Sequence, residues 1–226
     1  MAMGSRYFDG TNDVLGSVTM ADPGFPFTIA AWCYWPADTN YRTIVSYNNA
    51  AMPYRHYIRA QRDVVLGVTY MRFHVGSYRS LFTQGSATFS VALPATLPTW
   101  VHVVGVWEAT NKRSIYFYGI HQGTSIVNVT VTAPSKLYIG ANVAAEFWSG
   151  NIAHVSVWDV ALNANEIYAL YKGGSPANAR RPSVKGYWPL HGMASPEPNI
   201  VGGLGSMTVA GAVASGTGPH VIGPQW

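Results

Sequence analysis

The sequence contains few charged residues. Asp, Glu, Lys and Arg make up only 11% of its 226 residues, against about a quarter in a typical soluble domain. Disordered chains and long-helix proteins both depend on charged residues, so this scarcity excludes those two classes. We expect Ser, Thr, Asn, Gly and backbone groups to cover much of the surface instead.

Cysteine and long apolar runs are also nearly absent. Cys33, in the run IAAWCYW, is the single cysteine, so we expect no disulfide, a buried thiol and folding in a reducing compartment. No run approaches the roughly 18 apolar residues of a membrane helix. The start of the chain, MAMGSRYFDG, lacks the apolar core of a secretory signal. These features predict a soluble protein without a membrane partner or a signal peptide.

Aromatic and turn-forming residues are abundant: aromatics make up 13% of the chain, beside 23 Gly and 14 Pro. Strand-like segments recur about every ten residues, a spacing typical of a β-sandwich. The predicted strands are 7–10, 27–35, 42–47, 63–70, 72–77, 87–93, 100–107, 114–119, 125–131, 136–141 and 151–159. The apolar runs 27–35 and 100–107 are typical of central strands, and 100–119 reads as a hairpin.

One short helix is predicted near residues 163–172. Asn163 can cap it and Glu166 completes a capping box, while positions 167, 170 and 171 form one apolar stripe. A Gly-Gly pair then ends the helix. We expect one domain over 1–214, irregular at its edge from about 192, followed by a Gly/Pro-rich tail or arm over 215–226.

Four stretches in fixed order carry a family resemblance. They are YFDGTNDVLGSV, FTIAAWCYW, WVHVVGVWEATNKRSIYFYG and SGNIAHVSVWDVALNANEIYALYKGG. Together they resemble the laminin-G-like, pentraxin-related concanavalin A-like lectin/glucanase family, of the kind found in structural proteins of tailed bacteriophages. The resemblance spans roughly residues 6–192 and implies an all-β fold, an antiparallel two-sheet jelly-roll sandwich.

The tryptophans of these stretches are predicted to build the interior. Each could bury on the order of 150–250 Å², which makes them core and corner residues rather than ligand platforms. The set is Trp32, Trp100, Trp107, Trp158 and Trp188.

The sequence gives no catalytic signature, so we expect no enzyme and no catalytic residues. A glycosidase of this fold needs two carboxylates at a defined separation, and none of the ten acidic residues lies two positions from another. Carboxylates distant in sequence could still meet, which leaves a glycan hydrolase as an open alternative. His102 and His154 lie in predicted strands, where a hydrogen-bonded structural role is the favoured interpretation.

We also expect no metal and no cofactor. The segment GANVAAEFWSGN offers only Glu146 where pentraxin-like relatives cluster acidic residues for calcium, and one carboxylate cannot offset the dehydration of a divalent ion. Asp9 and Asp13 are interpreted as turn residues that bind neighbouring backbone groups.

Residues 41–79 form a basic, aromatic segment, with six arginines against Asp63 and a net charge of +5. Arginine and tyrosine anchor interfaces because each brings large contact area and directed hydrogen bonds. Contact with another protein, stacking on sugar rings and simple solvated strand faces all remain open, whereas nucleic acid would need a denser basic field. The candidate binding residues are Arg42, Tyr54, Arg55, Tyr57, Arg59, Arg62, Tyr78 and Arg79.

Three functions follow as hypotheses. The first is a bacteriophage virion component, a capsid-decorating or fibre-like subunit that docks on a capsid or other structural protein and forms a homo-oligomer. Such a protein assembles in the host cytoplasm, which agrees with the lack of a signal peptide and of disulfides. The second is a carbohydrate-binding, lectin-like module for cell-surface glycans. The third is the glycan hydrolase with a cryptic carboxylate pair.

Overall fold

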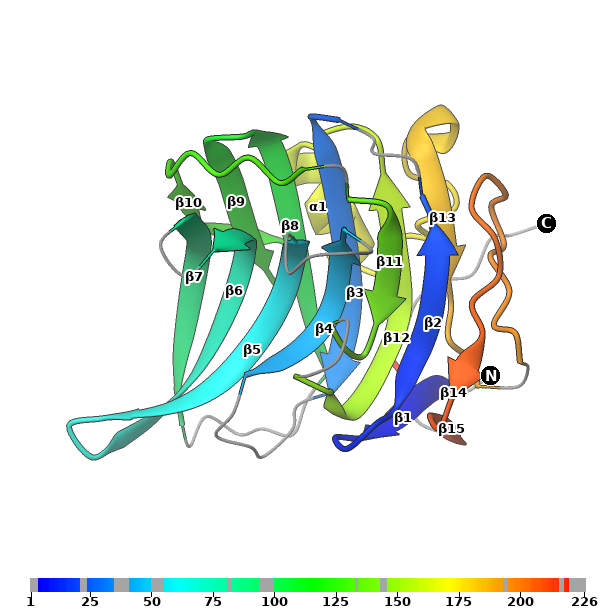
Figure 1. Ribbon diagram of the computed structural model, residues 1–226, viewed down its shortest axis with the longest axis horizontal. Coiled ribbons are helices and arrows are strands. Elements are labelled where there is room, and N and C mark those ends of the chain that lie inside the picture. The colour runs from blue at the N-terminus through cyan, green and yellow to red at the C-terminus, as the bar shows by residue number, and fades with distance from the viewer. Residues whose placement is uncertain are drawn as a thin grey trace.

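The structure, a computed structural model, describes residues 4–20, 24–34, 41–49, 55–80, 83–93, 100–132, 134–142, 146–192, 195–215 and 218–219. Two antiparallel sheets pack face to face, and the seven-stranded sheet faces the viewer in Figure 1. The expected all-β, two-sheet sandwich is confirmed, and so is its short helix.

The rear sheet has eight strands in the order β10-β9-β8-β3-β12-β1-β15, with β13 also paired to β12. Its strands are β1 (Ser5–Asp9), β3 (Phe27–Tyr34), β8 (Trp100–Ala109), β9 (Lys112–Phe117), β10 (Ile120–Ser125), β12 (Ser149–Trp158), β13 (Val184–Trp188) and β15 (Val213–Ser215). The predicted central strands are confirmed, because β3 pairs with both β8 and β12. The predicted hairpin of β8 and β9 is also present.

The front sheet has seven strands in the order β14-β2-β11-β4-β5-β6-β7. They are β2 (Val14–Thr19), β4 (Arg42–Asn48), β5 (Arg55–Val65), β6 (Val68–Ser80), β7 (Thr83–Leu93), β11 (Lys136–Ile139) and β14 (Val209–Ala210). Strands β4 to β7 form a meander of consecutive antiparallel neighbours. In β5, Ile58 and Ala60 enter the core, so strand alternation turns Arg55, Tyr57 and Arg59 to the outer face.

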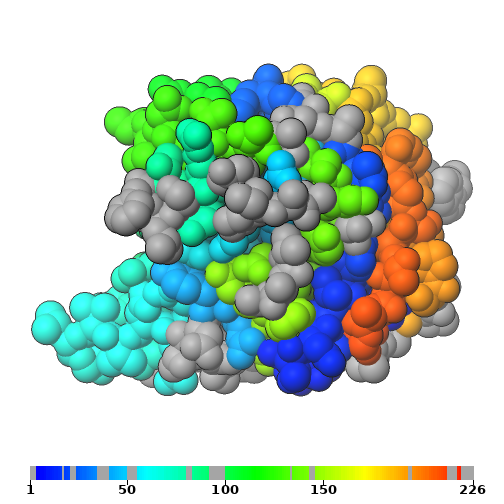
Figure 2. Space-filling view, viewed as in Figure 1, coloured from blue at the N-terminus to red at the C-terminus, as the bar shows by residue number. Residues whose placement is uncertain are grey.

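The prediction of one strand over 63–70 was wrong, because a hairpin turn divides this segment. Leu66 and Gly67 have φ values of 50° and 77°, the left-handed pair typical of a two-residue type I′ turn. The continuous apolar run concealed the turn, since Leu is not a usual residue there. The hairpin of β5 and β6 projects from the body at the lower left of Figures 1 and 2, and the side chain of Leu66 is 99% exposed.

The strand predicted over 125–131 was also wrong, because β10 ends at Ser125. The alternation in SIVNVTV has another cause: Val129 and Val131 are buried while Ile126 is exposed. The amide of Val129 donates to the carbonyl of Thr110 instead of to a neighbouring strand. An irregular segment with alternating burial therefore gave the same pattern as a strand.

Aromatic side chains fill the space between the sheets. The rings of Phe27 and Trp107 stack with centroids 4.8 Å apart. Of the predicted tryptophans, Trp107 and Trp188 are fully buried in this core. Trp158 is fully buried and Trp32 is 8% exposed, but both pack on the outer face of the eight-stranded sheet, beside α1; Trp100 is half-buried. Cys33 is buried as expected, and burial raises the pKa of its thiol.

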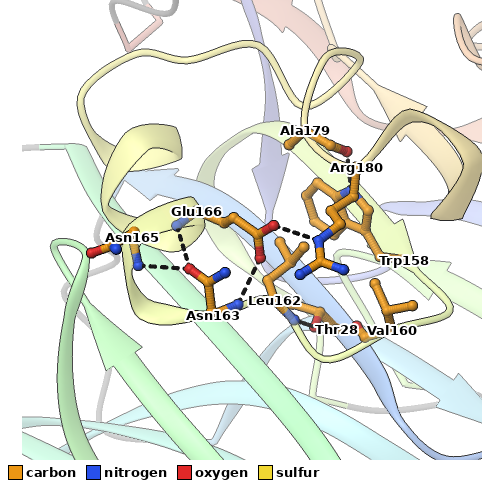
Figure 3. Close-up of polar contacts among 9 residues, drawn as sticks. All are labelled: Thr28, Trp158, Val160, Leu162, Asn163, Asn165, Glu166, Ala179 and Arg180. Carbon is orange, nitrogen blue, oxygen red and sulfur yellow. Dashed lines mark hydrogen bonds and ion pairs between the residues drawn. The ribbon is translucent and has the colours of Figure 1, made fainter.

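The corner after β12 is held by side chains that satisfy its turning backbone (Figure 3). The indole of Trp158 donates to the carbonyl of Ala179 at 2.9 Å. The hydroxyl of Thr28 donates to the carbonyl of Val160 at 2.7 Å and accepts from the amide of Leu162 at 3.0 Å. These bonds tie the corner to β3, which fixes where the following helix begins.

Helix α1 (Ala164–Tyr171) has the predicted capping box. The side chain of Asn163 accepts from the amides of Asn165 and Glu166, and Glu166 accepts from the amide of Asn163 (Figure 3). At the other end the amides of Gly173 and Gly174 donate to Leu170 and Ala169, the Schellman pattern. Ile167 and Leu170 pack α1 on the outer face of the eight-stranded sheet.

The segment from residue 195 to 215 packs into the sandwich, although its composition predicted irregular structure at the edge. Met207 is fully buried in the main core, and the short strands β14 and β15 each pair with a strand of the body. Arg6 and Glu197 form a buried ion pair at 2.9 Å. The predicted tail over 215–226 stays a prediction, since 216–217 and 220–226 lie outside the described residues. Among the described helices, none has the length and hydropathy needed to cross a membrane.

The cap of α1 gives a direct test of this local structure. Replacing Asn163 with Ala should lower the free energy of unfolding by about 1 kcal/mol, because two helix amides lose their acceptor. Urea unfolding followed by fluorescence measures the change. Asn165→Ala is the matched control: its exposed side chain lies two residues further on, and its cost should stay below roughly 0.5 kcal/mol. Equal losses in both variants would contradict the assigned cap.

Candidate functional site

Five side chains form a continuous stack on the outer face of the seven-stranded sheet. Arg55 lies over the ring of Tyr78 at 4.8 Å and near that of Tyr57 at 5.8 Å. Arg59 lies over Tyr57 at 4.4 Å and over Tyr41 at 3.8 Å. The order is Tyr78, Arg55, Tyr57, Arg59, Tyr41, so that cations and rings alternate. We call these five residues the arginine–tyrosine stack.

The local sequence explains the stack. Three of its members occupy alternate positions of β5, which places them on one face. Tyr78 lies on the neighbouring strand β6, directly opposite Arg55. Tyr57 needs room over the neighbouring strand, and Gly76 provides it: a Cβ atom there would lie 2.4 Å from the Tyr57 ring. Tyr57 is consequently almost fully buried, at 1% exposure, while Tyr41 at the end of the stack is 39% exposed.

One carboxylate joins the two arginines. Glu146 lies 3.3 Å from Arg55 and 3.4 Å from Arg59, and it accepts a hydrogen bond from Thr43 at 2.8 Å. Two guanidinium groups therefore share one carboxylate, so the stack and Glu146 together carry a net charge of +1. The Nε atoms of both arginines are buried without a hydrogen-bond partner, so part of their donor capacity is unused.

The eight predicted residues separate into two groups. Arg55, Tyr57, Arg59 and Tyr78 come together in the stack. Arg42 instead donates to the carbonyls of Gly10 and Phe147, each at 2.8 Å, and fastens two loops.

The rest of the predicted set lies elsewhere. Arg62 is at an even position of β5, so the uninterrupted β5–β6 register turns it to the opposite face. Arg79 is exposed at a break in the β6–β7 register. Tyr54 lies outside the described residues.

Sequence reasoning missed three members of the site. Tyr41 precedes β4, and Glu146 is 87 residues distant from Arg59 along the chain, so neither shares the β5 pattern. His74 pairs across the strands with Arg59 and lies 5.7 Å from the Tyr41 ring. Burial and the nearby Arg59 and Arg72 lower the pKa of His74 to about 3, so it adds no positive charge at neutral pH. Side chains alternate between the two faces along a strand, so the position of the β5–β6 turn would have been enough to place His74 on the same face as Arg59.

The acidic side chains that the structure describes were compared as candidate metal ligands and as turn residues. Among the described residues, no three His, Cys, Asp or Glu side chains lie close enough to hold a metal ion. Asp9 accepts from the amide of Thr11 at 2.7 Å, and Asp13 accepts from the amide of Asp9 at 2.8 Å. The prediction of turn hydrogen bonding for these two residues is confirmed.

Two facing antiparallel sheets, with a helix on one outer face and a polar, aromatic surface on the other, define a jelly-roll β-sandwich. The model of the concanavalin A-like lectin/glucanases superfamily, in its laminin-G-like form, matches residues 9–168. The chain belongs to this family, and the resemblance found in the sequence is confirmed. A search of curated protein sequences gave no match.

Solved structures share the fold at low sequence identity. A candidate carbohydrate-binding protein of Bacteroides ovatus is 18% identical, with a TM-score of 0.65 over 98% of this chain and 62% of that one. The chain thus spans less than two thirds of that relative. A heptameric pentraxin of Limulus polyphemus is 19% identical over 94% of both chains, with a TM-score of 0.60. The enzymatically active domain of a tailspike protein of bacteriophage CBA120 is 14% identical, with a TM-score of 0.52 over 81% of this chain and 29% of that one.

Buried histidines make the stability of the fold depend on pH. Burial is the main cause that lowers the pKa of four of them from 6.5 to about 3: His56, His74, His102 and His154. The unfolded chain takes up protons below pH 6.5, whereas the folded chain does not, so stability is full above that pH and falls as the pH drops toward 3. Each histidine contributes about 1.4 kcal/mol per pH unit within this range.

We therefore expect the free energy of unfolding in urea to fall by several kcal/mol between pH 7.5 and pH 5. His56→Gln should reduce this slope by one histidine's share. A free energy that is the same at both values would show that these rings are protonated in the folded protein.

Proposed function

We propose that this protein is a non-catalytic, lectin-like carbohydrate-binding domain whose glycan site lies over the arginine–tyrosine stack. The single observation that carries the proposal is the stack itself, in which aromatic rings reach the surface beside arginine donors. Sugar rings present flat C–H faces and many hydroxyl groups, so they fit a surface that offers both partners. The Bacteroides ovatus relative supports the proposal only as far as its description as a carbohydrate-binding protein goes.

Hydrogen-bonding side chains extend the face beyond the stack. On β7, Gln84, Thr88 and Ser90 are exposed, and they pair across the sheet with Tyr78, His74 and Arg72. The outer face of β7 thus offers a row of neutral donors and acceptors beside the aromatic rings. Such a surface suits a chain of several sugar units better than a single deep-bound ligand.

We propose that this face is not catalytic. Glu146 is engaged by two arginines and one hydroxyl, so it is neither a free acid nor a free nucleophile. A hydrolase would need a second carboxylate about 5–10 Å away. Asp63, which could supply one on this face, is paired with Arg72 at 2.9 Å.

A glycan-binding assay with point variants tests the site. Tyr41→Ala and Tyr78→Ala should each weaken glycan binding about tenfold, roughly 1.4 kcal/mol, because each removes a ring at an accessible end of the stack. Isothermal titration with oligosaccharides selected on a glycan array gives the affinity. Tyr168→Ala is the matched control, since Tyr168 is 46% exposed on α1. Absence of glycan binding, or equal loss in the control, would refute the site.

We further propose a setting for this domain: a bacteriophage virion, as a capsid-decorating or fibre-like subunit that self-associates and docks on another structural protein. The tailspike relative supports only the compatibility of this fold with a phage particle. Self-association is supported by an apolar hairpin tip, where Val64, Val65, Leu66 and Val68 are 64%, 44%, 99% and 40% exposed. Exposed apolar groups of this kind favour contact with a partner.

This setting predicts an oligomer. Light scattering should give a mass that is a multiple of the 24.5 kDa chain, and Leu66→Asp should shift the population toward the monomer. Ile126→Asp is the control, since Ile126 is 78% exposed away from the hairpin. The chain should also be found by mass spectrometry in purified virions. A monomer at all concentrations, or virions that lack the chain, would rule this setting out.

A further inference from the structure

The projecting hairpin of β5 and β6 has one strand edge that no described strand covers. On this side of β5, Ala60 pairs with Arg42, the first residue of β4. Strand β5 continues to Val65, so among the described strands residues 61–65 pair with β6 alone. The turn is open as well, because a Cβ atom on Gly67 would meet nothing within 4 Å. The hairpin thus extends beyond the sheet with one side of β5 unpaired (Figure 1).

The turn fixes which backbone groups of β5 point away from the hairpin. It has two residues, 66–67, so Val65 and Val68 are the closing pair that exchanges both backbone hydrogen bonds. Bonded and non-bonded pairs alternate along an antiparallel ladder, and the register of β5 and β6 has no shift. The N–H and C=O groups of Val64 and Arg62 therefore point away from β6. No backbone group of the described residues bonds to them.

The end of this edge lacks the features that usually protect an exposed strand. Natural edge strands carry Lys or Pro, bend at a bulge, or are covered by another segment. Residues 64–68 contain no charge and no proline, and Val64, Val65 and Leu66 are 64%, 44% and 99% exposed. Unpaired backbone groups beside exposed β-branched side chains form a template for one more strand.

The partner of such an edge has to be an extended strand with unpaired backbone groups and apolar side chains. The same edge of a second copy of this chain meets that requirement. Two identical edges pair antiparallel about a two-fold axis, which closes the assembly at a dimer. The charges of Arg62 and Asp63 cancel within the unpaired stretch, so two such edges meet without a net charge of one sign.

We propose that two copies of the chain join by antiparallel pairing of their β5 edges over residues 61–65, so that their seven-stranded sheets become one continuous sheet. This inference rests on the self-association proposed above and specifies its contact. Pairing withdraws the exposed valines of both copies from water. The paired stretch is short, whereas stable interfaces bury at least about 1,000 Å². The dimer therefore dissociates on dilution.

Amide hydrogen exchange over a dilution series tests the pairing directly. The amides of Arg62 and Val64 should exchange fast in the dilute monomer and become protected in concentrated solution. The amides of Asp63 and Val65 bond within the hairpin, so their protection should not depend on concentration. These two amides are the internal control. Exchange of Arg62 and Val64 at one rate over the whole series would overturn the pairing.

Two substitutions at Val64 separate the backbone contact from the side-chain contact. Val64→Pro removes the outward N–H, and an edge position tolerates proline. It should weaken association at least about tenfold, because each copy loses one hydrogen bond to the other. Val64→Thr is the matched control: it keeps the N–H and the branched shape, so association should stay within about threefold of the natural chain. Light scattering gives the dissociation constants, and protected amides of Asp63 and Val65 show that the hairpin of the proline variant is intact.

The outcomes distinguish this inference from the proposed function. Association that is lost in Leu66→Asp but unchanged in Val64→Pro would refute the edge pairing and leave the proposed self-association standing. A chain that stays monomeric at every concentration would refute both. Protection of Arg62 and Val64 in virions alone would assign the edge to another protein and so refute pairing with a second copy. Glycan binding is measured separately and should be the same in Val64→Pro as in the natural chain.

Discussion

Packing of apolar side chains between the two sheets is the constraint on which the other features depend. Because strand residues alternate with a period of two, each side chain that enters the core fixes where its neighbours point. In β5, burial of Ile58 and Ala60 turns Arg55, Tyr57 and Arg59 outward. A slip of one residue would bring two guanidinium groups into the core, at a cost no local contact could offset. The core therefore determines the register that builds the stack.

The outer faces of the two sheets differ in how they are covered. Helix α1 and the segment after it lie on the eight-stranded sheet, where Trp158, Leu162 and Ile167 form a second apolar cluster. The outer face of the seven-stranded sheet is polar, and its arginines are stacked on rings and paired with Glu146. The chain has few charges and concentrates several of them on this face, which is why we propose recognition there.

The sequence predicted the fold because the strongest signals are local. The apolar runs of β3 and β8, and the capping box at Asn163, each depend on neighbouring residues alone. The predictions failed where contacts between residues far apart in the chain determine the local structure. The turn at Leu66 shows only once β5 and β6 are paired, and Val129 is buried by contacts outside any strand.

The candidate site was predictable to the same limited extent. Four of its arginines and tyrosines lie on β5 and β6, within one basic and aromatic segment that composition alone singles out. Tyr41 opens the same segment but precedes β4, and Glu146 lies far outside it, so both reach the stack through folding and neither shares the strand alternation of Arg59.

Three residues other than glycine that were described above have left-handed backbone conformations. Their φ values are 57° at Glu146, 51° at His154 and 50° at Leu66. Such conformations cost of order 1–3 kcal/mol and persist when surrounding contacts enforce them. Arg55 and Arg59 hold Glu146, and Tyr187 holds His154. Leu66 is held by the turn that the pairing of Val65 with Val68 closes, while its side chain stays almost completely exposed. The fold therefore accounts for the conformation of Leu66 but not for an exposed apolar side chain at this position, and that exposure is why we place the proposed self-association at the hairpin tip.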